Sequence, residues 1–335
     1  MRSNPRGAGI LPLLLTACLL ACCQPKKGKA GIRQTPASTQ KTRVPACHPD
    51  SLMAFVRAQT AFGPRIPNSG SQKACAAYLA RQLESCGATV QVQEFESLRW
   101  DKVRLKGYNV TAAFFPEKTR RVLLCAHWDS RPYADRDPDP EAARTPIDGA
   151  NDGASGTAGL LEIARLLRDH TPSVGVDIVL FDLEDSGKPD HERHVQGDEY
   201  TWCLGSQHWS ENLPYGNRPI YGILLDMVGT ERPCFTMEAT SMYYAPDIMR
   251  KVWEKAALMG HGDIFQNRAT GALIDDHLFI NDIARIPVID IIHHDDATES
   301  GFFPHWHTRQ DNILHVSPST LKITGDVVLA TVFDE

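Results

Sequence analysis

The chain has 335 residues, and 42% of them are apolar, which is enough to bury a sizeable core in a single α/β catalytic domain. Its 35 basic and 41 acidic side chains leave a net charge of −6. The basic residues form no dense block beyond Lys26, Lys27 and Lys29. This composition excludes nucleic acid as an expected partner.

The first residues have the layout of a signal peptide. Arg2 and Arg6 precede an apolar stretch over residues 10–20, and small residues and cysteine follow it. The stretch is too short to be a convincing membrane span. We therefore expect residues 1–22 to direct export of the chain.

The segment Leu19-Leu20-Ala21-Cys22 resembles the bacterial lipobox, in which the cysteine is lipidated and becomes the first residue of the mature protein. Cys18 and Cys23 also fit as the lipidated residue, so the mature N-terminus stays open. An ordinary cleaved signal of a soluble periplasmic protein is the alternative. We expect a periplasmic lipoprotein of a Gram-negative bacterium that meets the membrane only through its N-terminal lipid anchor.

Residues 23–46 predict a flexible tether, because they are rich in Lys, Gln, Thr, Ser and Pro and have too few large apolar residues to offset the entropy of ordering. The catalytic domain is then residues 47–335. Its six cysteines form no CxxC pair, so they are either buried free thiols or members of one or two disulfides. They are Cys47, Cys75, Cys86, Cys125, Cys203 and Cys234.

Apolar residues recur at helical spacing after residue 50 and over residues 74–83, which predicts two helices before the sheet. Short runs rich in Val, Ile, Leu and Phe predict six strands, over residues 89–95, 108–115, 122–126, 176–181, 220–228 and 287–292. Two further helices are expected, over residues 156–167 and 246–259. This alternation predicts a three-layer α/β/α sandwich around a central mixed, mostly parallel sheet.

In such a sheet, ligands bind outside the carboxyl ends of the strands. His127 and Asp226 stand at the ends of two predicted strands, and Glu184-Asp185 follow a third. Asp152 comes directly before a helix, and His307 lies in a later loop. Taken singly, each residue has an ordinary explanation such as a helix N-cap or a turn, but their joint occurrence favours a functional site.

Zinc takes imidazole and carboxylate ligands, and a catalytic zinc keeps one position open. Asp152, Asp185 and His307 would supply three ligands and leave that opening. Glu184 is adjacent to a ligand and, on an extended backbone, points to the other side, so it would be free to act as a general base.

Six segments together resemble the motifs of the animal-type (type II) zinc-dependent glutaminyl-peptide cyclotransferases, which share the fold of the zinc aminopeptidases. The segments are residues 126–129, 149–156, 181–185, 225–227, 275–277 and 306–308. The resemblance covers roughly residues 50–334. Residues 62–67 and 202–206 bring the chain close to the lipobox-bearing bacterial branch.

The resemblance implies conversion of the N-terminal glutamine of peptides and proteins to pyroglutamate, with one Zn²⁺ per chain. It implies that Asp152, Asp185 and His307 hold the zinc, although Asp185 stands where the mammalian enzymes have a second glutamate. Glu184 would shuttle the proton. The remaining residues that the resemblance implies are Asp226 and Asp275 in a carboxylate network beside Glu184, and Trp202 and Trp306 as candidate apolar walls of the substrate pocket. Cys125 has no obvious partner near residue 157, so the mammalian disulfide beside the site is not expected here.

Two alternatives stay open. In a zinc aminopeptidase of the same fold, His127 and Asp226 would complete a second metal site and Asp152 would bridge the two ions. Trp306 and the segment 275–277 resemble the cyclases more closely. A non-catalytic, lipid-anchored peptide-binding protein is disfavoured because it would not need a free Glu184 beside a metal ligand.

Overall fold

The computed structural model describes residues 44–192, 194, 200–214, 216 and 218–335. The predicted signal peptide over residues 1–22 lies outside these residues, as does the predicted tether except for residues 44–46. Among the described residues, no helix is both long enough and apolar enough to cross a membrane.

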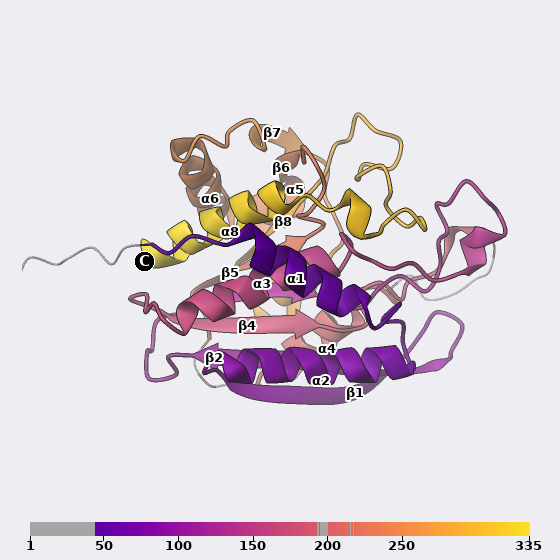
Figure 1. Ribbon diagram of the computed structural model, residues 1–335, viewed down its shortest axis with the longest axis horizontal. Coiled ribbons are helices and arrows are strands. Elements are labelled where there is room, and N and C mark those ends of the chain that lie inside the picture. The colour runs from indigo at the N-terminus through magenta and orange to yellow at the C-terminus, as the bar shows by residue number, and fades with distance from the viewer. Residues whose placement is uncertain (1–43, 193, 195–199, 215, 217) are drawn as a thin grey trace, which may run out of the picture. The chain divides into compact units, whose positions relative to one another are not determined.

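A six-stranded sheet forms the middle layer of the domain, in the order β1-β2-β4-β3-β5-β8 (Figure 1). Strands β3, β4, β5 and β8 are parallel to their neighbours in this group, whereas β1 pairs antiparallel with β2 and β2 antiparallel with β4. A separate parallel pair consists of β6 (Phe235–Glu238) and β7 (Phe265–Thr270). The predicted mixed, mostly parallel sheet is confirmed. Its strands are β1 (Thr89–Leu98), β2 (Arg104–Phe114), β3 (Arg121–His127), β4 (Gly175–Phe181), β5 (Tyr221–Asp226) and β8 (Val288–Ile292).

Helices cover both faces of this sheet, because successive side chains of β3 pack into two different core clusters. Leu124 packs into the larger core cluster, with residues of α1, α3 and α8. Cys125, the next residue, packs with Trp209 of α4 in the second cluster on the opposite face. The described helices are α1 (Pro49–Thr60), α2 (Gly70–Ser85), α3 (Ala154–Leu167), α4 (Leu204–Glu211), α5 (Ala239–Tyr244), α6 (Pro246–Leu258), α7 (Asp276–Phe279) and α8 (Pro318–Phe333).

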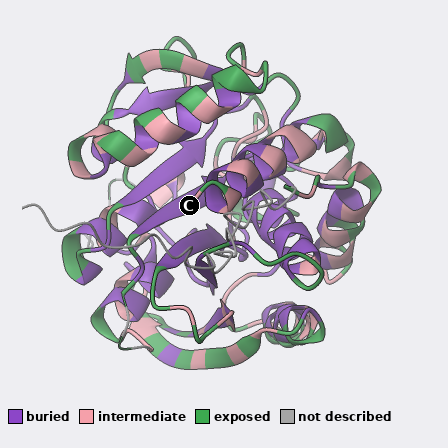
Figure 2. Ribbon diagram, turned by 90° about the vertical axis from the view of Figure 1, so that its left-hand side faces the viewer, coloured by how far each residue is buried: buried purple, intermediate pink, exposed green. Residues whose placement is uncertain are grey.

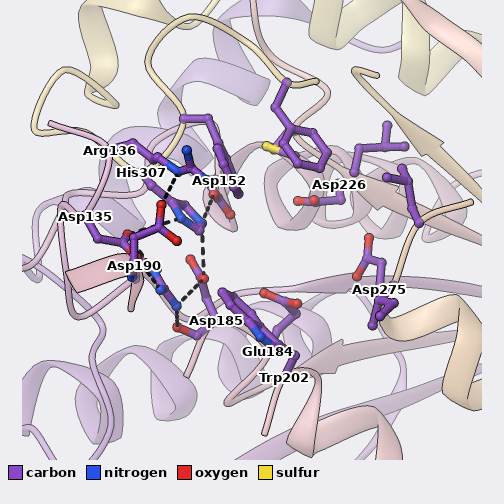
Figure 3. A pocket seen from close by; sticks show the side chains of 17 residues that line it. Asp135, Arg136, Asp152, Glu184, Asp185, Asp190, Trp202, Asp226, Asp275 and His307 are labelled. Carbon is purple, nitrogen blue, oxygen red and sulfur yellow. Dashed lines mark hydrogen bonds and ion pairs between the residues drawn. The ribbon is translucent and has the colours of Figure 1, made fainter. Parts of the chain in front are cut away.

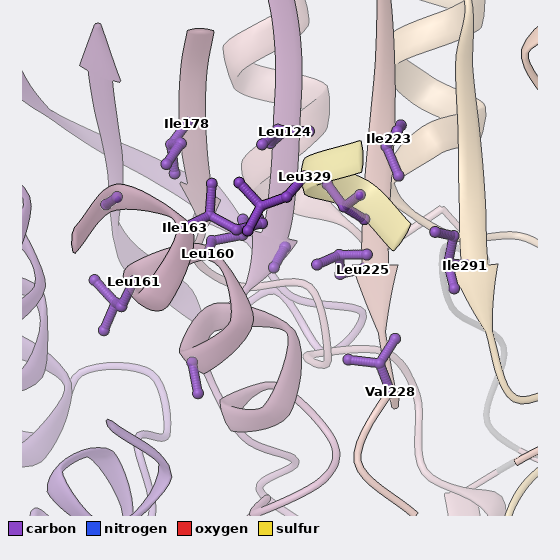
Figure 4. Close-up of a cluster of buried hydrophobic side chains, with 14 of the residues drawn as sticks. Leu124, Leu160, Leu161, Ile163, Ile178, Ile223, Leu225, Val228, Ile291 and Leu329 are labelled. Atoms are coloured by element: carbon purple, nitrogen blue, oxygen red, sulfur yellow. The ribbon is translucent and has the colours of Figure 1, made fainter. Parts of the chain in front are cut away.

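The central strands are buried along their whole length, which matches their continuous apolar runs (Figure 2). In the larger cluster, Leu124 of β3 and Leu225 of β5 lie on the side of the sheet that carries Leu160 and Ile163 of α3 (Figure 4). Burial of apolar side chains on both faces supplies the main favourable free energy of such a fold. The three-layer architecture is therefore confirmed.

Helix α8 is the longest element that the sequence patterns do not predict. It is buried around most of its circumference, through residues that include Leu321, Val328 and Leu329, so it has no apolar stripe at helical spacing. A start signal is nevertheless present: Ser317 Oγ accepts a hydrogen bond from the Thr320 amide, and Pro318 occupies the first turn. The patterns also miss α4, α5, α7, β6 and β7, which are short.

All six described cysteines are buried and free. Of the two alternatives left open by their spacing, the structure shows free thiols.

Helix α3 packs very closely on β5 because it carries glycine at the contact. A Cβ atom placed on Gly156 would lie 2.1 Å from the backbone oxygen of Leu225. At Gly159, one turn later, a Cβ atom would meet only the Leu225 side chain, at 3.5 Å. This close approach brings Asp152, which lies two residues before the start of α3, to the end of β5.

We predict that Gly156→Ala destabilises the fold by about 1–3 kcal/mol, because the added methyl group collides with backbone that cannot move alone. Gly159→Ala is the matched control in the same helix, and we expect it to be neutral or to stabilise by up to about 1 kcal/mol, since alanine favours helix over glycine. Urea unfolding of both variants measures the difference. Equal free energies of unfolding would contradict the close contact.

Candidate active site

A pocket of about 240 Å³ lies where β4 and β5 end, lined by acidic and aromatic side chains (Figure 3). Sites for drug-sized ligands are typically about 300–1,000 Å³. The pocket is therefore suited to one amino-acid side chain rather than a long peptide segment. Its apolar lining includes Leu273, Ile274 and Phe302.

Three predicted zinc ligands, Asp152, Asp185 and His307, meet in this pocket (Figure 3). Their ligand atoms all lie within 4.8 Å of one another. His307 Nε2 is 3.3 Å from Asp185 Oδ1 and 3.7 Å from Asp152 Oδ2. Two ligands that bind one tetrahedral zinc ion at about 2.0–2.2 Å lie about 3.4 Å apart, so these spacings suit a shared ion.

The environment of Asp185 also fits a cation. Its Oδ2 atom is buried and accepts no hydrogen bond from any described residue. Burial raises the pKa of Asp185, and Asp152 adds to the effect. Because an unpaired buried carboxylate oxygen is costly, a bound divalent ion would satisfy it, and a donor set of one imidazole and two carboxylates suits zinc.

Asp135 and Arg131 orient the ring of His307 through its Nδ1 atom. Its Nδ1 atom lies 3.3 Å from Asp135 Oδ1, and Arg131 Nη2 donates to Asp135 Oδ2 at 2.7 Å. Arg131 Nη1 also donates to the backbone oxygen of Asp185 at 3.1 Å. Such a chain fixes which ring nitrogen of a histidine faces a metal, so Nε2 is presented to Asp152 and Asp185.

Glu184 lies beside this donor set but turns its carboxylate elsewhere. Its Oε1 atom accepts a hydrogen bond from Cys203 Sγ at 3.1 Å, and a carboxylate oxygen of Asp275 is within 4.8 Å. Burial, followed by Asp185, Asp275 and other neighbouring carboxylates, raises the pKa of Glu184 well above its ordinary value, although His127 opposes the shift.

The sequence-based reason for the separation of Glu184 from Asp185 was wrong. The two residues are not on an extended strand: β4 ends at Phe181, and Leu183 then adopts a left-handed conformation with φ 59°. The chain bends there, and the bend rather than strand alternation sends the two carboxylates in different directions.

His127 and Asp226 form a second donor set with Asp152. His127 Nε2 lies 3.0 Å from Asp226 Oδ1 and 3.1 Å from Asp152 Oδ1. Burial alone would lower the pKa of His127, but Asp226, Asp129 and Asp152 outweigh it and raise the pKa well above its ordinary value. Burial also raises the pKa of Asp226 to about 7. Asp152 therefore belongs to both sets.

Asp275 lines the same pocket, at the N-cap of α7, where its Oδ1 accepts the amide hydrogen of Asp276. The structure thus brings Asp275 and Asp226 into one cavity with Glu184 (Figure 3). No direct hydrogen bond joins Asp226 or Asp275 to Glu184 among the described residues, so the predicted carboxylate network is a neighbourhood rather than a bonded chain.

Both predicted tryptophans line the pocket. The Trp306 ring stacks on His307 with centroids 3.9 Å apart, and the Trp202 ring is parallel to His307 at 6.2 Å. Trp202 lies flat on Gly187, where a Cβ atom would come within 1.9 Å of the indole, and the Arg131 guanidinium lies 4.5 Å from its ring. These contacts fix the apolar part of the site.

Two aspartates that hold the site together have roles that sequence reasoning missed. Asp129 accepts the backbone N–H groups of Glu184 and Asp185, each at 3.2 Å, and lies 3.3 Å from His127 Nδ1. Asp311 accepts the backbone N–H of Asp152 at 3.0 Å. Asp129 follows a strand end, which was a usable signal, but nothing local to Asp311 indicates its partner 159 positions away.

The profile of peptidase family M28 matches residues 109–332. The crystal structure of a glutaminyl cyclase from Tannerella forsythia is 46% identical with a TM-score of 0.84, covering 87% of this chain and 100% of that one. A Zn-dependent exopeptidase from Parabacteroides distasonis is 44% identical with a TM-score of 0.85, covering 88% of this chain and 100% of that one.

Similarity to curated proteins is more distant. Aminopeptidase YwaD of Bacillus subtilis is 28% identical over 219 residues, which is 64% of this chain. The chain spans 40% of the length of each of the first curated relatives that it matches. The chain thus belongs to peptidase family M28, and its predicted resemblance to the bacterial glutaminyl cyclases within the zinc exopeptidase fold is confirmed.

Proposed function

We propose that the protein is a glutaminyl-peptide cyclotransferase, which closes the N-terminal glutamine of peptides and proteins into pyroglutamate and releases ammonia. The observation that carries the proposal is the position of Glu184, whose carboxylate lies beside the set of Asp152, Asp185 and His307 but faces Cys203 and Asp275 instead. The likeness to glutaminyl cyclases over nearly the whole described chain supports the same activity.

We infer one zinc ion per chain, held by Asp152, Asp185 and His307. Bound there, zinc would act as a Lewis acid toward the side-chain amide oxygen of the substrate. In the second donor set, His127 Nε2 lies only 3.0 and 3.1 Å from Asp226 and Asp152. These are hydrogen-bond distances, shorter than the separation of about 3.4 Å between ligands around one tetrahedral zinc, which favours a single ion.

Cyclisation forms a bond between the α-amine nitrogen and the side-chain carbonyl carbon of the same glutamine, and breaks the bond from that carbon to the amide nitrogen. Because nucleophile and electrophile belong to one residue, little entropy is lost in bringing them together. Glu184 accepts the proton that the attacking amine loses and returns it to the departing ammonia. Its raised pKa suits a group that must both take and give a proton.

The pocket accounts for a substrate with a free N-terminus. Its volume of about 240 Å³ accommodates one side chain. The carboxyl groups of Asp226 and Asp275 lie in the same cavity and can accept hydrogen bonds from the amino group of the substrate, while Trp202 and Trp306 supply apolar surface that excludes water.

A zinc aminopeptidase is the second candidate, because His127, Asp152 and Asp226 could complete a two-metal site. We expect purified protein to convert a Gln-initiated peptide to a product lighter by one ammonia, as read by mass spectrometry. A product lighter by a whole residue would assign the peptidase activity. An unchanged peptide in the presence of zinc would exclude both activities.

We predict that Glu184→Gln keeps the fold and the zinc but lowers kcat by about 10²–10⁴-fold, because an amide of nearly the same shape cannot accept and return a proton. Asp185→Asn, the adjacent matched change, removes a ligand charge and should lower bound zinc as well as activity. Elemental analysis, thermal melting and pyroglutamate formation are measured for both variants and for wild type, in which we expect one zinc per chain. Loss of zinc from Glu184→Gln with retention in Asp185→Asn would reverse the two assignments.

We further propose that the protein is a periplasmic lipoprotein anchored through Cys22, on the basis of the segment Leu19-Leu20-Ala21 before it. Cys22→Ser should abolish the lipid mass and release the protein from the membrane fraction of the producing cells. A variant that keeps the same lipid would move the anchor to Cys18 or Cys23. An unlipidated wild type would reject the anchor.

A further inference from the structure

Cys203 occupies a backbone conformation that non-glycine residues seldom adopt. It has φ 55° and directly precedes α4. A residue held in this left-handed region costs conformational energy and persists only where surrounding contacts determine it. The contacts of Cys203 explain why this conformation is retained.

Backbone contacts hold Cys203 against the segment that carries Glu184. The Cys203 amide donates to the backbone oxygen of Glu184 at 2.8 Å, and the Leu204 amide donates to that of Leu183 at 3.1 Å. Gly205 allows this approach, since a Cβ atom there would lie 2.1 Å from the Asp182 backbone oxygen. The start of α4 is therefore docked on the bend after β4.

The side chain of Cys203 then reaches the functional group itself. Its Sγ atom is 3.1 Å from Glu184 Oε1, and the residue is fully buried. Burial raises the pKa of the Cys203 thiol well above its ordinary value, and the charge of Glu184 adds to this. The thiol is therefore neutral, and beside a carboxylate it serves as a weak hydrogen-bond donor. Among the described residues, no other side chain donates a hydrogen bond to the Glu184 carboxylate.

We infer that Cys203 is a positioning residue, which holds the Glu184 carboxylate in the orientation that proton transfer requires. The inference rests on the proposed cyclase function, in which Glu184 exchanges protons with the substrate. A glutamate at a pocket wall otherwise samples several rotamers, and a misplacement of about 1 Å can cost a factor of about 10² in rate.

The test uses the purified full-length protein with a Gln-initiated peptide. Cys203→Ala should lower kcat by about 10- to 100-fold with little change in KM, while zinc content stays at the wild-type value. Cys203→Ser keeps a donor on the same Cβ atom and should recover kcat to within a few-fold of wild type. Cys75→Ala is the matched control: Cys75 is equally buried, on α2, and should leave kcat unchanged.

A double-mutant cycle separates positioning from general destabilisation. In the Glu184→Gln background, Cys203→Ala should cause almost no further loss, because the group it positions has already lost its function. If Cys203→Ala does not fold, the same comparison is made with Cys203→Ser, whose small loss should likewise vanish in that background.

The assignment is overturned if Cys203→Ala has the wild-type kcat, if serine fails to rescue a folded alanine variant, or if the loss is the same in both backgrounds. A wild-type protein that forms no pyroglutamate overturns the proposed function before any variant is compared. A wild-type protein that forms pyroglutamate, together with an active Cys203→Ala, overturns only the role of Cys203.

Discussion

The carboxylate of Asp129 fixes the arrangement of the site, because it links the ends of β3, β4 and β5. It follows β3, it accepts the two amides of the segment after β4, and it lies against the ring of His127, whose other nitrogen faces the end of β5. The positions of Glu184 and Asp185 are therefore set by a residue that lines no part of the pocket itself.

The second constraint is electrostatic. Asp152, Asp185, Glu184, Asp226 and Asp275 line one cavity, and the pKa values of several of these carboxylic acids are raised by burial and by one another. Bringing like charges together out of water is unfavourable unless a cation balances them. Arg131 balances only part of this negative charge, and the remaining charge favours the binding of a cation. The charge repulsion that destabilises the fold is thus also the source of the affinity of the pocket for cations.

Sequence patterns were sufficient to predict the sheet and the residues at its carboxyl edge, because buried parallel strands are continuous apolar runs and the polar residues after them are conspicuous. They failed where the determining contact is distant. The link from Asp311 to Asp152 joins segments 159 positions apart, and no local pattern indicates that Trp202 packs on Gly187. The bend at Leu183 could not be predicted either, since leucine has no preference for positive φ; it is set by the contacts of β4, Asp129 and α4.

Asp152 faces both donor sets, through Oδ1 toward His127 and through Oδ2 toward His307. The two donor sets are therefore not independent, because they share one carboxylate group. A substitution that moves the Asp152 carboxylate relative to His127 therefore also changes its position relative to His307.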